Sequence, residues 1–285
     1  TAIASIKNPL VIGSSFISLE FLEIFRANNI APSILMRDEH FFGSYLDENG
    51  GELMRSHFEH HHIRLYEGDE IREIRREANG MMAITKKPEL IACDSLAVGI
   101  GIDRNLEFLD GMSILRGAAG VRVNEFFETN QEDVYAAGDV AEVFDPREGA
   151  HRLIGNWTSA FLQGKHAGLS MAGRREPFIH VPSYSITNLG FQITFVGDCL
   201  PAADLPKGDT LAVNEPNDTI VRIDPANRQY ERLFFKGGAL KGAVLINRFS
   251  DKTSITRLIE SGQNLDAYRE HLSSFQFDIT AIPVV

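Results

Sequence analysis

The alternation of apolar and polar residues at the start of the chain predicts a strand, a helix and a second strand. Residues 9–12 form an apolar run of strand length that ends at Gly13, and residues 33–36 form another short run. Between them, apolar side chains recur through residues 16–26 with the spacing of a largely buried helix. A strand, tight turn, helix and strand in this order form a βαβ unit, whose two strands are parallel.

The pattern continues in the same style as far as residue 101. Residues 48–59 are predicted to form a helix and residues 62–66 a strand. Residues 71–76 and 81–85 are predicted to form antiparallel strands, because Asn79-Gly80 between them favours a tight hairpin turn. Residues 90–98 are predicted to form one buried strand that ends at Gly99-Ile100-Gly101. This order fits a Rossmann-type half with a small β-meander inserted before its last strand.

The rest of the chain changes character twice. Residues 133–136 are predicted to form a strand and residues 158–172 a helix, after which 173–182 carries little periodicity and is interpreted as a linker. Short strands are expected in the tail at residues 220–223, 230–235 and 243–246. Helices follow at residues 252–260, closed by Gly262, and at 265–273. The expected fold class is therefore α/β, with a separate antiparallel α+β module at the end.

Composition narrows the class of protein. The 285 residues suit two or more domains, and 28 basic against 39 acidic residues give a net charge of −11. Such a charge is unfavourable for nucleic acid, whereas it suits solubility or a basic protein partner. Cys93 and Cys199 form no C-x-x-C pair, so no zinc site and no local dithiol is indicated. Two cysteines, and apolar runs no longer than a strand, predict a cytoplasmic protein that has no membrane partner.

The first chemical motif is Gly13-Ser14-Ser15-Phe16-Ile17-Ser18, which follows a strand and opens a helix. This is the place of a dinucleotide-binding turn, where small residues let the backbone N–H groups approach a pyrophosphate. Ser15 and Ser18 replace two of the usual three glycines. Serine is small enough for the turn, and its hydroxyl is expected to be able to donate to a phosphate oxygen.

The residues after the second strand bear on the choice of nucleotide. An acidic residue there binds the ribose 2′-hydroxyl of NADH, whereas an arginine favours the 2′-phosphate of NADPH. The strand ends Met36-Arg37-Asp38-Glu39, which offers both signs of charge. An ordinary charged loop has the same composition, so both nucleotides stay open and Arg37 is a candidate contact.

A second motif covers residues 129–139 and ends in Ala136-Ala137-Gly138-Asp139. A strand followed by a turn of small residues lets the chain approach a ligand, and Asp139 can accept hydrogen bonds from sugar-like hydroxyls. A plainer interpretation makes Asp139 the N-cap of a following helix. That role leaves the eleven-residue pattern unexplained.

These motifs resemble those of FAD-dependent pyridine nucleotide-disulfide oxidoreductases. Residues 129–139 resemble the motif T-x-x-x-x-[VI]-[YF]-A-x-G-D, in which the aspartate contacts the ribitol and pyrophosphate region of FAD. Residues 13–20 resemble the NAD(P)-binding turn of this family, and Glu20 occupies the position of a glutamate near the nicotinamide pocket. The resemblance implies FAD and NAD(P)H as cofactors.

Further residues extend the resemblance across the chain. Gly99 and Gly101 are similar to the turn that returns the chain to the FAD domain, although an A-T-G opening is absent and Asp103 replaces a common proline. Trp157 and Gln163-Gly164-Lys165 resemble the helix that approaches the flavin. Residues 188–191, 196–198 and 240–246 resemble the C-terminal interface domain. The implied relatives are NADH:rubredoxin reductase, the flavin subunit of nitrite reductase, ferredoxin reductases and NADH oxidases.

The resemblance implies a domain order and an activity. Residues 1–104 would form the NAD(P)-binding domain, 105–172 the C-terminal part of an FAD-binding domain, 173–182 a linker and 183–285 an interface domain. Hydride would pass from NAD(P)H to flavin, and electrons would pass on to a redox protein or small acceptor. The resemblance also implies a homodimer. No catalytic residue of the chain and no metal is implied. The alternative is a non-catalytic nucleotide-binding or scaffold protein that has lost FAD.

The family also has an N-terminal G-x-G-x-x-G turn for the ADP half of FAD, which this sequence lacks. A shortened expression product, a wrongly assigned start or a natural split with a second chain would each explain it. The family's redox cysteines lie in the same segment, so Cys93 and Cys199 are assigned no chemistry. We expect the strand at residues 133–136 to lack a sheet to join, and the chain alone to bind nucleotide weakly with little turnover.

Three polar groups invite other interpretations. His57 and His60-His61-His62 suggest a metal site, but they fall at a helix-to-strand junction. Arg72, Arg75 and Arg76 are most simply solvated positions on a strand. Lys86-Lys87 leads directly into Pro88, so a solvated turn is the favoured interpretation over a phosphate anchor.

Overall fold

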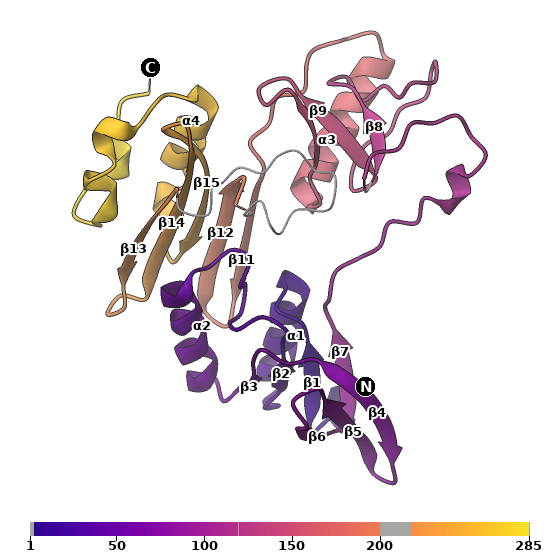
Figure 1. The fold of residues 1–285 in the computed structure, drawn as a ribbon, viewed down its shortest axis with the longest axis vertical. Helices are drawn as coiled ribbons and strands as arrows, with labels where there is room; N and C mark the ends of the chain where they lie inside the picture. The colour runs from indigo at the N-terminus through magenta and orange to yellow at the C-terminus, as the bar shows by residue number, and fades with distance from the viewer. Residues whose placement is uncertain (1–2, 119, 200–217, 285) are drawn as a thin grey trace. The chain divides into compact units, whose positions relative to one another are not determined.

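A computed structural model of the chain describes residues 3–118, 120–199 and 218–284 (Figure 1). Its contacts divide the chain into two compact units. The first unit holds residues 1–102, 186–192 and 223–230, and the second holds residues 103–185, 193–222 and 231–285.

The first unit is built on a parallel sheet with the strand order β3-β2-β1-β7. Its elements are β1 (Pro9–Ile12), α1 (Phe16–Ala27), β2 (Ser33–Leu35), α2 (Glu48–His60), β3 (Arg64–Tyr66) and β7 (Ser95–Val98). Leu10 of β1 lies opposite Ser33 of β2 and Leu96 of β7. Leu10, Val11 and Leu22 are fully buried, as the apolar pattern predicts. The α/β fold class is confirmed.

The antiparallel meander consists of β4 (Ile71–Glu77), β5 (Gly80–Thr85) and β6 (Leu90–Cys93). The predicted hairpin at Asn79-Gly80 is confirmed, because Glu77 pairs with Gly80. The prediction of one strand over residues 90–98 is wrong. The run divides at Asp94, since β6 pairs with β5 whereas β7 pairs with β1 in the other sheet. The Asp94 carboxylate accepts from the N–H groups of Lys7 and Asn8, which holds the chain at this change of sheet.

Two glycines let α2 be approached closely. Asp47 caps the helix by accepting from the Gly50 N–H at 3.0 Å. A Cβ on Gly50 would lie 2.9 Å from the Tyr230 ring, and one on Gly51 would lie 2.4 Å from the His40 ring. Tyr230 in turn donates to Asp47 at 3.0 Å. The residues 223–230 are therefore packed onto α2 within the first unit.

The second unit begins with a small sheet of order β10-β9-β8 and one helix. Its elements are β8 (Val121–Val123), β9 (Ala141–Asp145), β10 (Ala150–Leu153) and α3 (Trp157–Met171). The prediction of a strand at residues 133–136 is wrong. Asp133 has a φ of 59°, and Tyr135 forms only an isolated bridge to Glu128, so the segment folds back as a tight turn.

The tail forms a five-stranded sheet of order β11-β12-β15-β14-β13. The strands are β11 (Ser183–Asn188), β12 (Phe191–Gly197), β13 (Thr219–Asp224), β14 (Gln229–Lys236) and β15 (Ala239–Ile246). The helix α4 (Lys252–Ser261) ends at Gly262, whose φ of 62° is the predicted left-handed C-cap. The predicted helix at residues 265–273 is wrong: two 3₁₀ turns, Asp266–Tyr268 and His271–Ser273, occupy it. Asn264 accepts from the Asp266 N–H and favours the short turn.

Short 3₁₀ turns complete the described elements. They are Ile3–Ser5, Glu107–Leu109, Phe249–Asp251 and Ile279–Ala281. Residues 173–182 contain no helix or strand. Among the described residues, no helix is both long enough and apolar enough to span a membrane.

A buried ionic network holds the end of the chain on this sheet. Arg222, with a side chain 1% exposed, donates through Nε to the Glu231 carboxylate at 2.6 Å. The ring of Phe275 lies 4.7 Å from the Arg222 guanidinium and 5.0 Å from that of Arg248. Arg222 also donates to the backbone carbonyl of Phe277. The network thus joins β13 and β14 to the last turns of the chain.

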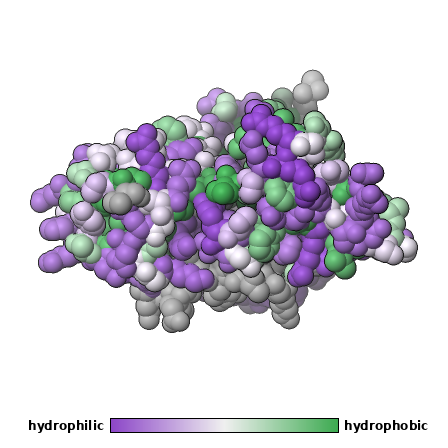
Figure 2. Space-filling model, turned by 90° about the horizontal axis from the view of Figure 1, so that it is seen from above, coloured by the Kyte–Doolittle hydropathy of each residue, from purple (hydrophilic) through white to green (hydrophobic). Residues whose placement is uncertain are grey.

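The surface is mostly polar on the face that Figure 2 draws. Hydrophobic side chains gather there in smaller patches between the hydrophilic ones. Several large apolar side chains are exposed nevertheless, among them Trp157 at 80% and Ile100 at 74%.

Candidate functional site

A cleft of about 560 Å³ opens in the first unit at the carboxyl ends of β1, β2 and β7. In open α/β sheets, ligands bind at this end of the strands. Seven of the residues predicted from sequence line the cleft: Gly13, Ser14, Ser15, Phe16, Arg37, Gly99 and Gly101.

Gly13 brings the turn after β1 against the turn after β7. Its φ is 111°, and a Cβ at this position would lie 2.3 Å from the carbonyl oxygen of Gly99. A side chain is excluded by both the conformation and the space. The close approach that a dinucleotide-binding turn requires is therefore present.

The hydroxyls of Ser15 and Ser18 are directed to a protein acceptor. Ser15 donates to the Gly99 carbonyl at 2.7 Å, and Ser18 donates to the same oxygen at 3.2 Å. Ser15 also caps α1 by accepting from the Ser18 N–H. A hydroxyl has one proton to donate, so in this arrangement both protons are directed to Gly99, and the expectation that these serines donate to a phosphate oxygen stays a prediction. Backbone N–H groups at the start of α1 are left for that role.

Ser14 donates its hydroxyl to the carboxylate of Asp38, which is half-buried in the wall of the cleft. Arg37, the neighbouring candidate, is exposed. The sequence offered both signs of charge at this point. The structure fixes the negative one in place.

Two candidates lie outside the cleft. Ile17 is half exposed on α1, and Glu20 lies one turn further along the same helix. Neither is among the residues that line the cleft.

The loop that follows β2 also lines the cleft and was not predicted from the sequence. Phe42, Gly43, Ser44 and Tyr45 line the cleft, and the Phe42 ring lies 4.9 Å from that of Phe16. Phe41 and Phe42 are both buried. The signal that marked this loop is the aromatic cluster between the second strand and α2, which a loop of ordinary composition would lack.

The second candidate site lies in the second unit, at Gly138-Asp139. Gly138 is buried with a φ of 83°, and its N–H donates to the Gln163 side-chain carbonyl at 2.8 Å. Asp139 is exposed, and its backbone carbonyl accepts from Arg104. The strand β9 begins at Ala141, so no helix follows and the N-cap interpretation of Asp139 is wrong.

Gln163 carries an unpaired donor beside this turn. The residue is fully buried on α3, and its Nε2 has no hydrogen-bond partner among the described residues. An unsatisfied buried donor of this kind costs about 1–3 kcal/mol. A ligand acceptor that reaches Gln163 would remove that cost.

The start of α3 presents an aromatic face to solvent. Trp157 and Phe161 are one helical turn apart, with ring centroids 6.0 Å apart and planes inclined by 14°. They are 80% and 61% exposed. Asn156 caps the helix by accepting from the Ser159 N–H at 2.8 Å.

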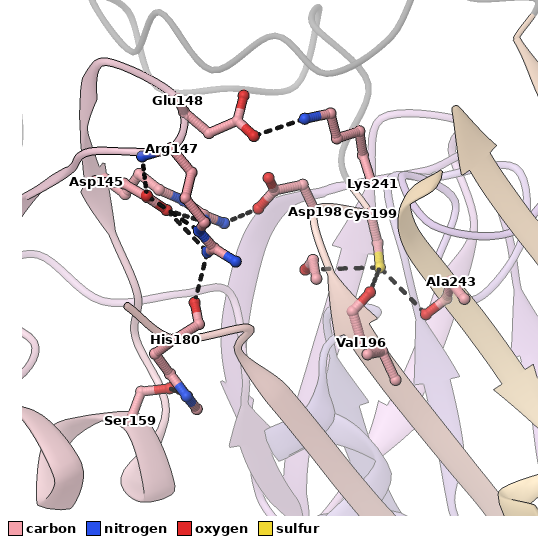
Figure 3. Close-up of polar contacts among 12 residues, drawn as sticks. Asp145, Arg147, Glu148, Ser159, His180, Val196, Asp198, Cys199, Lys241 and Ala243 are labelled. Atoms are coloured by element: carbon pink, nitrogen blue, oxygen red, sulfur yellow. Dashed lines mark hydrogen bonds and ion pairs between the residues drawn. The ribbon is translucent and has the colours of Figure 1, made fainter. Parts of the chain in front are cut away.

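Figure 3 shows a separate polar cluster in the same unit. Arg152 is buried and contacts the carboxylates of both Asp145 and Asp198. In Figure 3, Lys241 points to Glu148, to which it donates at 2.7 Å. Each of these cations already faces a carboxylate. The cluster is a compensated ion-pair network rather than a binding site for an anion.

Cys199 lies beside this cluster and its thiol is buried. Its Sγ is 3.3 Å from the carbonyl oxygens of Val196 and Ala243 (Figure 3). Complete burial raises the pKa of the thiol to about 12. Cys93 is also buried, with a raised pKa for the same reason, and both cysteines are free.

His57, one of the clustered histidines, packs against a segment distant in sequence. His57 is buried on α2, stacks on Phe191 at 3.5 Å and shares a hydrogen bond with the Leu189 carbonyl. Within the part of the chain that the structure describes, no group of three or more His, Cys, Asp or Glu residues is placed to hold a metal ion.

These features define a class of protein. A parallel βαβ sheet with a glycine turn at the cleft, and a second Gly-Asp turn in another unit, are typical of dinucleotide-binding oxidoreductases. The model of the pyridine nucleotide-disulphide oxidoreductases matches residues 2–164, and the chain belongs to that family. The family uses FAD and NAD(P)H. Residues 208–263 match the C-terminal domain of rubredoxin NAD+ reductase.

Individual relatives agree with this assignment. The human apoptosis-inducing factor 3 is 24% identical over 230 residues, covering 78% of this chain and 38% of the relative. The NADH-rubredoxin oxidoreductase of Clostridium acetobutylicum is 23% identical over 257 residues, covering 90% and 59%. The fold is similar to that of a ferredoxin reductase from Rhodopseudomonas palustris, with a TM-score of 0.81 at 20% identity, covering 97% and 65%. The chain therefore spans roughly two fifths to three fifths of the length of these curated relatives.

Proposed function

We propose that this chain is the NAD(P)H-binding part, with half of the flavin site, of an FAD-dependent oxidoreductase. Hydride would pass from NAD(P)H to FAD and electrons to a redox protein or a small acceptor. The observation that carries the proposal is a pair of turns. Gly13 packs against the Gly99 carbonyl at the cleft of the first unit, and the Gly138 N–H donates to Gln163 in the second unit.

The residues of the second turn fit FAD. The Asp139 carboxylate is exposed and suited to accept from ribitol hydroxyls, and the unpaired Nε2 of Gln163 is suited to donate to the cofactor. The exposed rings of Trp157 and Phe161 supply a flat apolar surface. When bound, FAD supplies the acceptor for hydride, and the chain's own residues bind and orient it.

The nucleotide cleft fits NADH better than NADPH. Asp38 is held in the wall by Ser14, and a fixed carboxylate accepts from a ribose 2′-hydroxyl but repels a 2′-phosphate. Arg37 is exposed beside it. We infer that NADH is the preferred donor.

The proposed domains follow the sequence analysis. Residues 1–104 bind NAD(P)H, 105–172 contribute to FAD binding, 173–182 link, and 183–285 form an interface module for a homodimer. The change of unit at Ile102 supports the first limit. The names of the relatives favour a small redox protein as the electron acceptor. A cytoplasmic location is proposed with it, from the two buried, unpaired cysteines.

The visible absorption spectrum of the purified chain, with and without added FAD, tests the flavin proposal. We expect the visible absorbance of bound flavin after addition of FAD. Addition of NADH should bleach this absorbance, because it reduces the flavin. Asp139→Ala should lower the affinity for FAD about tenfold, because a charge-assisted hydrogen bond is lost. The exposed Glu132→Ala, seven residues away, is the matched control and should not change it. A chain that binds NADH but no FAD under any condition supports the non-catalytic alternative.

A further inference from the structure

The hydroxyls of Ser15 and Ser18 converge on one atom. Both donate to the carbonyl oxygen of Gly99, at 2.7 and 3.2 Å, and the two hydroxyl oxygens are 3.3 Å apart. Ser18 is fully buried. Glycine at either position, as in the usual dinucleotide turn, would leave these bonds unmade. The two serines therefore add hydrogen bonds between the start of α1 and the turn after β7.

Gly99 anchors the turn after β7 through hydrogen bonds of its own backbone. Its N–H donates to the Ile12 carbonyl at 2.8 Å, while its own carbonyl accepts from the two serines. Beyond it, Ile100 is 74% exposed. Gly101 has a φ of 102°, and a Cβ there would meet no described atom within 4 Å. The position of the turn thus depends on the hydrogen bonds at Gly99.

The sheet order places this turn on the nicotinamide side of the cleft. β2 and β7 lie on opposite sides of β1. In such a sheet the end of β2 holds the adenosine ribose, and the turn after β1 holds the pyrophosphate. The other half of the nucleotide must then extend toward the end of β7, where Gly99, Ile100 and Gly101 line the cleft.

We propose that Ser15 and Ser18 are positioning residues that fix the nicotinamide-side wall of the nucleotide cleft through Gly99. The proposal rests on the proposed binding of NADH. It separates two parts of the ligand: the backbone N–H groups of α1 bind the pyrophosphate, and the two hydroxyls donate their protons to the wall beyond it, although Ser15 also caps α1. Loss of the hydroxyls should weaken NADH and leave ADP, which ends at the pyrophosphate, nearly unaffected.

The experiment compares dissociation constants for NADH and for ADP on the full 285-residue chain. Ser18→Ala should weaken NADH about fivefold, the equivalent of one ordinary hydrogen bond, and the double variant with Ser15→Ala more than tenfold. The affinity for ADP should change less than twofold in Ser18→Ala. Ser15→Thr keeps a hydroxyl and the helix cap, so it should keep the affinity for NADH. Ser56→Ala, an exposed serine on α2, is the control for a neutral substitution.

The outcomes separate the two proposals. Equal losses for NADH and ADP in a folded Ser18→Ala, or no loss for either, would overturn the positioning role and leave NADH binding intact as the proposed function. A wild-type chain that binds neither ligand would overturn both. If Ser18→Ala unfolds, as far-ultraviolet circular dichroism would show, Ser15→Thr decides: a loss of NADH affinity with the hydroxyl kept contradicts the proposal.

Discussion

At the scale of single residues, three serines of the nucleotide turn each donate to a protein acceptor. Ser14 donates to Asp38, while Ser15 and Ser18 donate to Gly99. The hydroxyls therefore shape the cleft, and anion binding is proposed for the backbone N–H groups of α1. In the second unit, by contrast, one buried side-chain donor has no partner among the described residues. It is Nε2 of Gln163, whose carbonyl accepts from the Gly138 N–H.

The charge at Asp38 gives a prediction at this scale. Asp38→Asn should lower the preference for NADH over NADPH about tenfold, because the variant removes the repulsion of a 2′-phosphate while an amide still accepts from a 2′-hydroxyl. The ratio of the two dissociation constants measures it. Asp47→Asn, at the cap of α2, should leave this ratio at the wild-type value. An unchanged ratio in Asp38→Asn would show that another group selects the nucleotide.

At the scale of elements, α2 is joined to segments distant in sequence. Gly50 admits the ring of Tyr230 near the start of the helix. Near its end, His57 stacks on Phe191 and contacts the Leu189 carbonyl, while the Leu189 N–H donates to Glu23 of α1. Leu189 adopts a φ of 54°, which a branched side chain disfavours and which these two contacts hold.

His57 gives this element a dependence on pH. Burial, together with the neighbouring His61, lowers the pKa of His57 from 6.5 to about 4. As the pH falls from 6.5 to 4, the unfolded chain takes up a proton that the folded chain does not. The free energy of unfolding should therefore fall over this range, by up to roughly 3 kcal/mol. Below pH 4, His57 should cause no further loss of stability, because it is protonated in both states.

Urea denaturation at a series of pH values measures this effect. His57→Phe keeps an aromatic ring against Phe191 but cannot titrate, so its stability should depend less on pH between 6.5 and 4. His62→Asn, at an exposed position with a φ of 56°, should retain the wild-type profile. Identical profiles for His57→Phe and wild type would exclude His57 as the source.

At the scale of the whole molecule, the two proposed cofactor sites lie in different units, and two ionic networks lie within the second unit. The cluster around Arg152 joins β9 and β10 to Asp198, and the network around Arg222 fixes the end of the chain. Neither network contains a proposed cofactor residue. We therefore expect their loss to reduce stability rather than the choice of ligand.

Glu231→Gln tests that separation. Removal of Glu231 from this buried ion pair leaves Arg222 with Asp251, 3.5 Å away, as its acidic partner, so the free energy of unfolding should fall by about 1.5–3 kcal/mol. The double variant Arg222→Met/Glu231→Leu, which removes both charges, should recover much of this loss. Glu260→Gln, at an exposed position, is the control. A loss below about 1 kcal/mol in Glu231→Gln would show that the pair contributes little.

Local patterns in the sequence determined much of this protein. The spacing of apolar residues predicted β1, α1 and β2, and Asn79-Gly80 predicted the hairpin, because these elements depend on neighbours a few residues apart. The small residues at Gly13 and Gly138 marked both turns, and their motifs led to the family that the comparison confirms. A glycine signal survives in sequence because the backbone conformation it permits is a local property.

Only the tertiary structure decided where the hydrogen bonds go. The run 90–98 divides because β6 finds a partner in β5 and β7 finds one in β1, and nothing within the run specifies either. The serine hydroxyls donate to Gly99, 84 and 81 residues away. Gln163 faces Gly138 across 25 residues. A single donor satisfies whichever acceptor the fold brings within reach, so its role follows from packing between distant segments and not from the residues beside it.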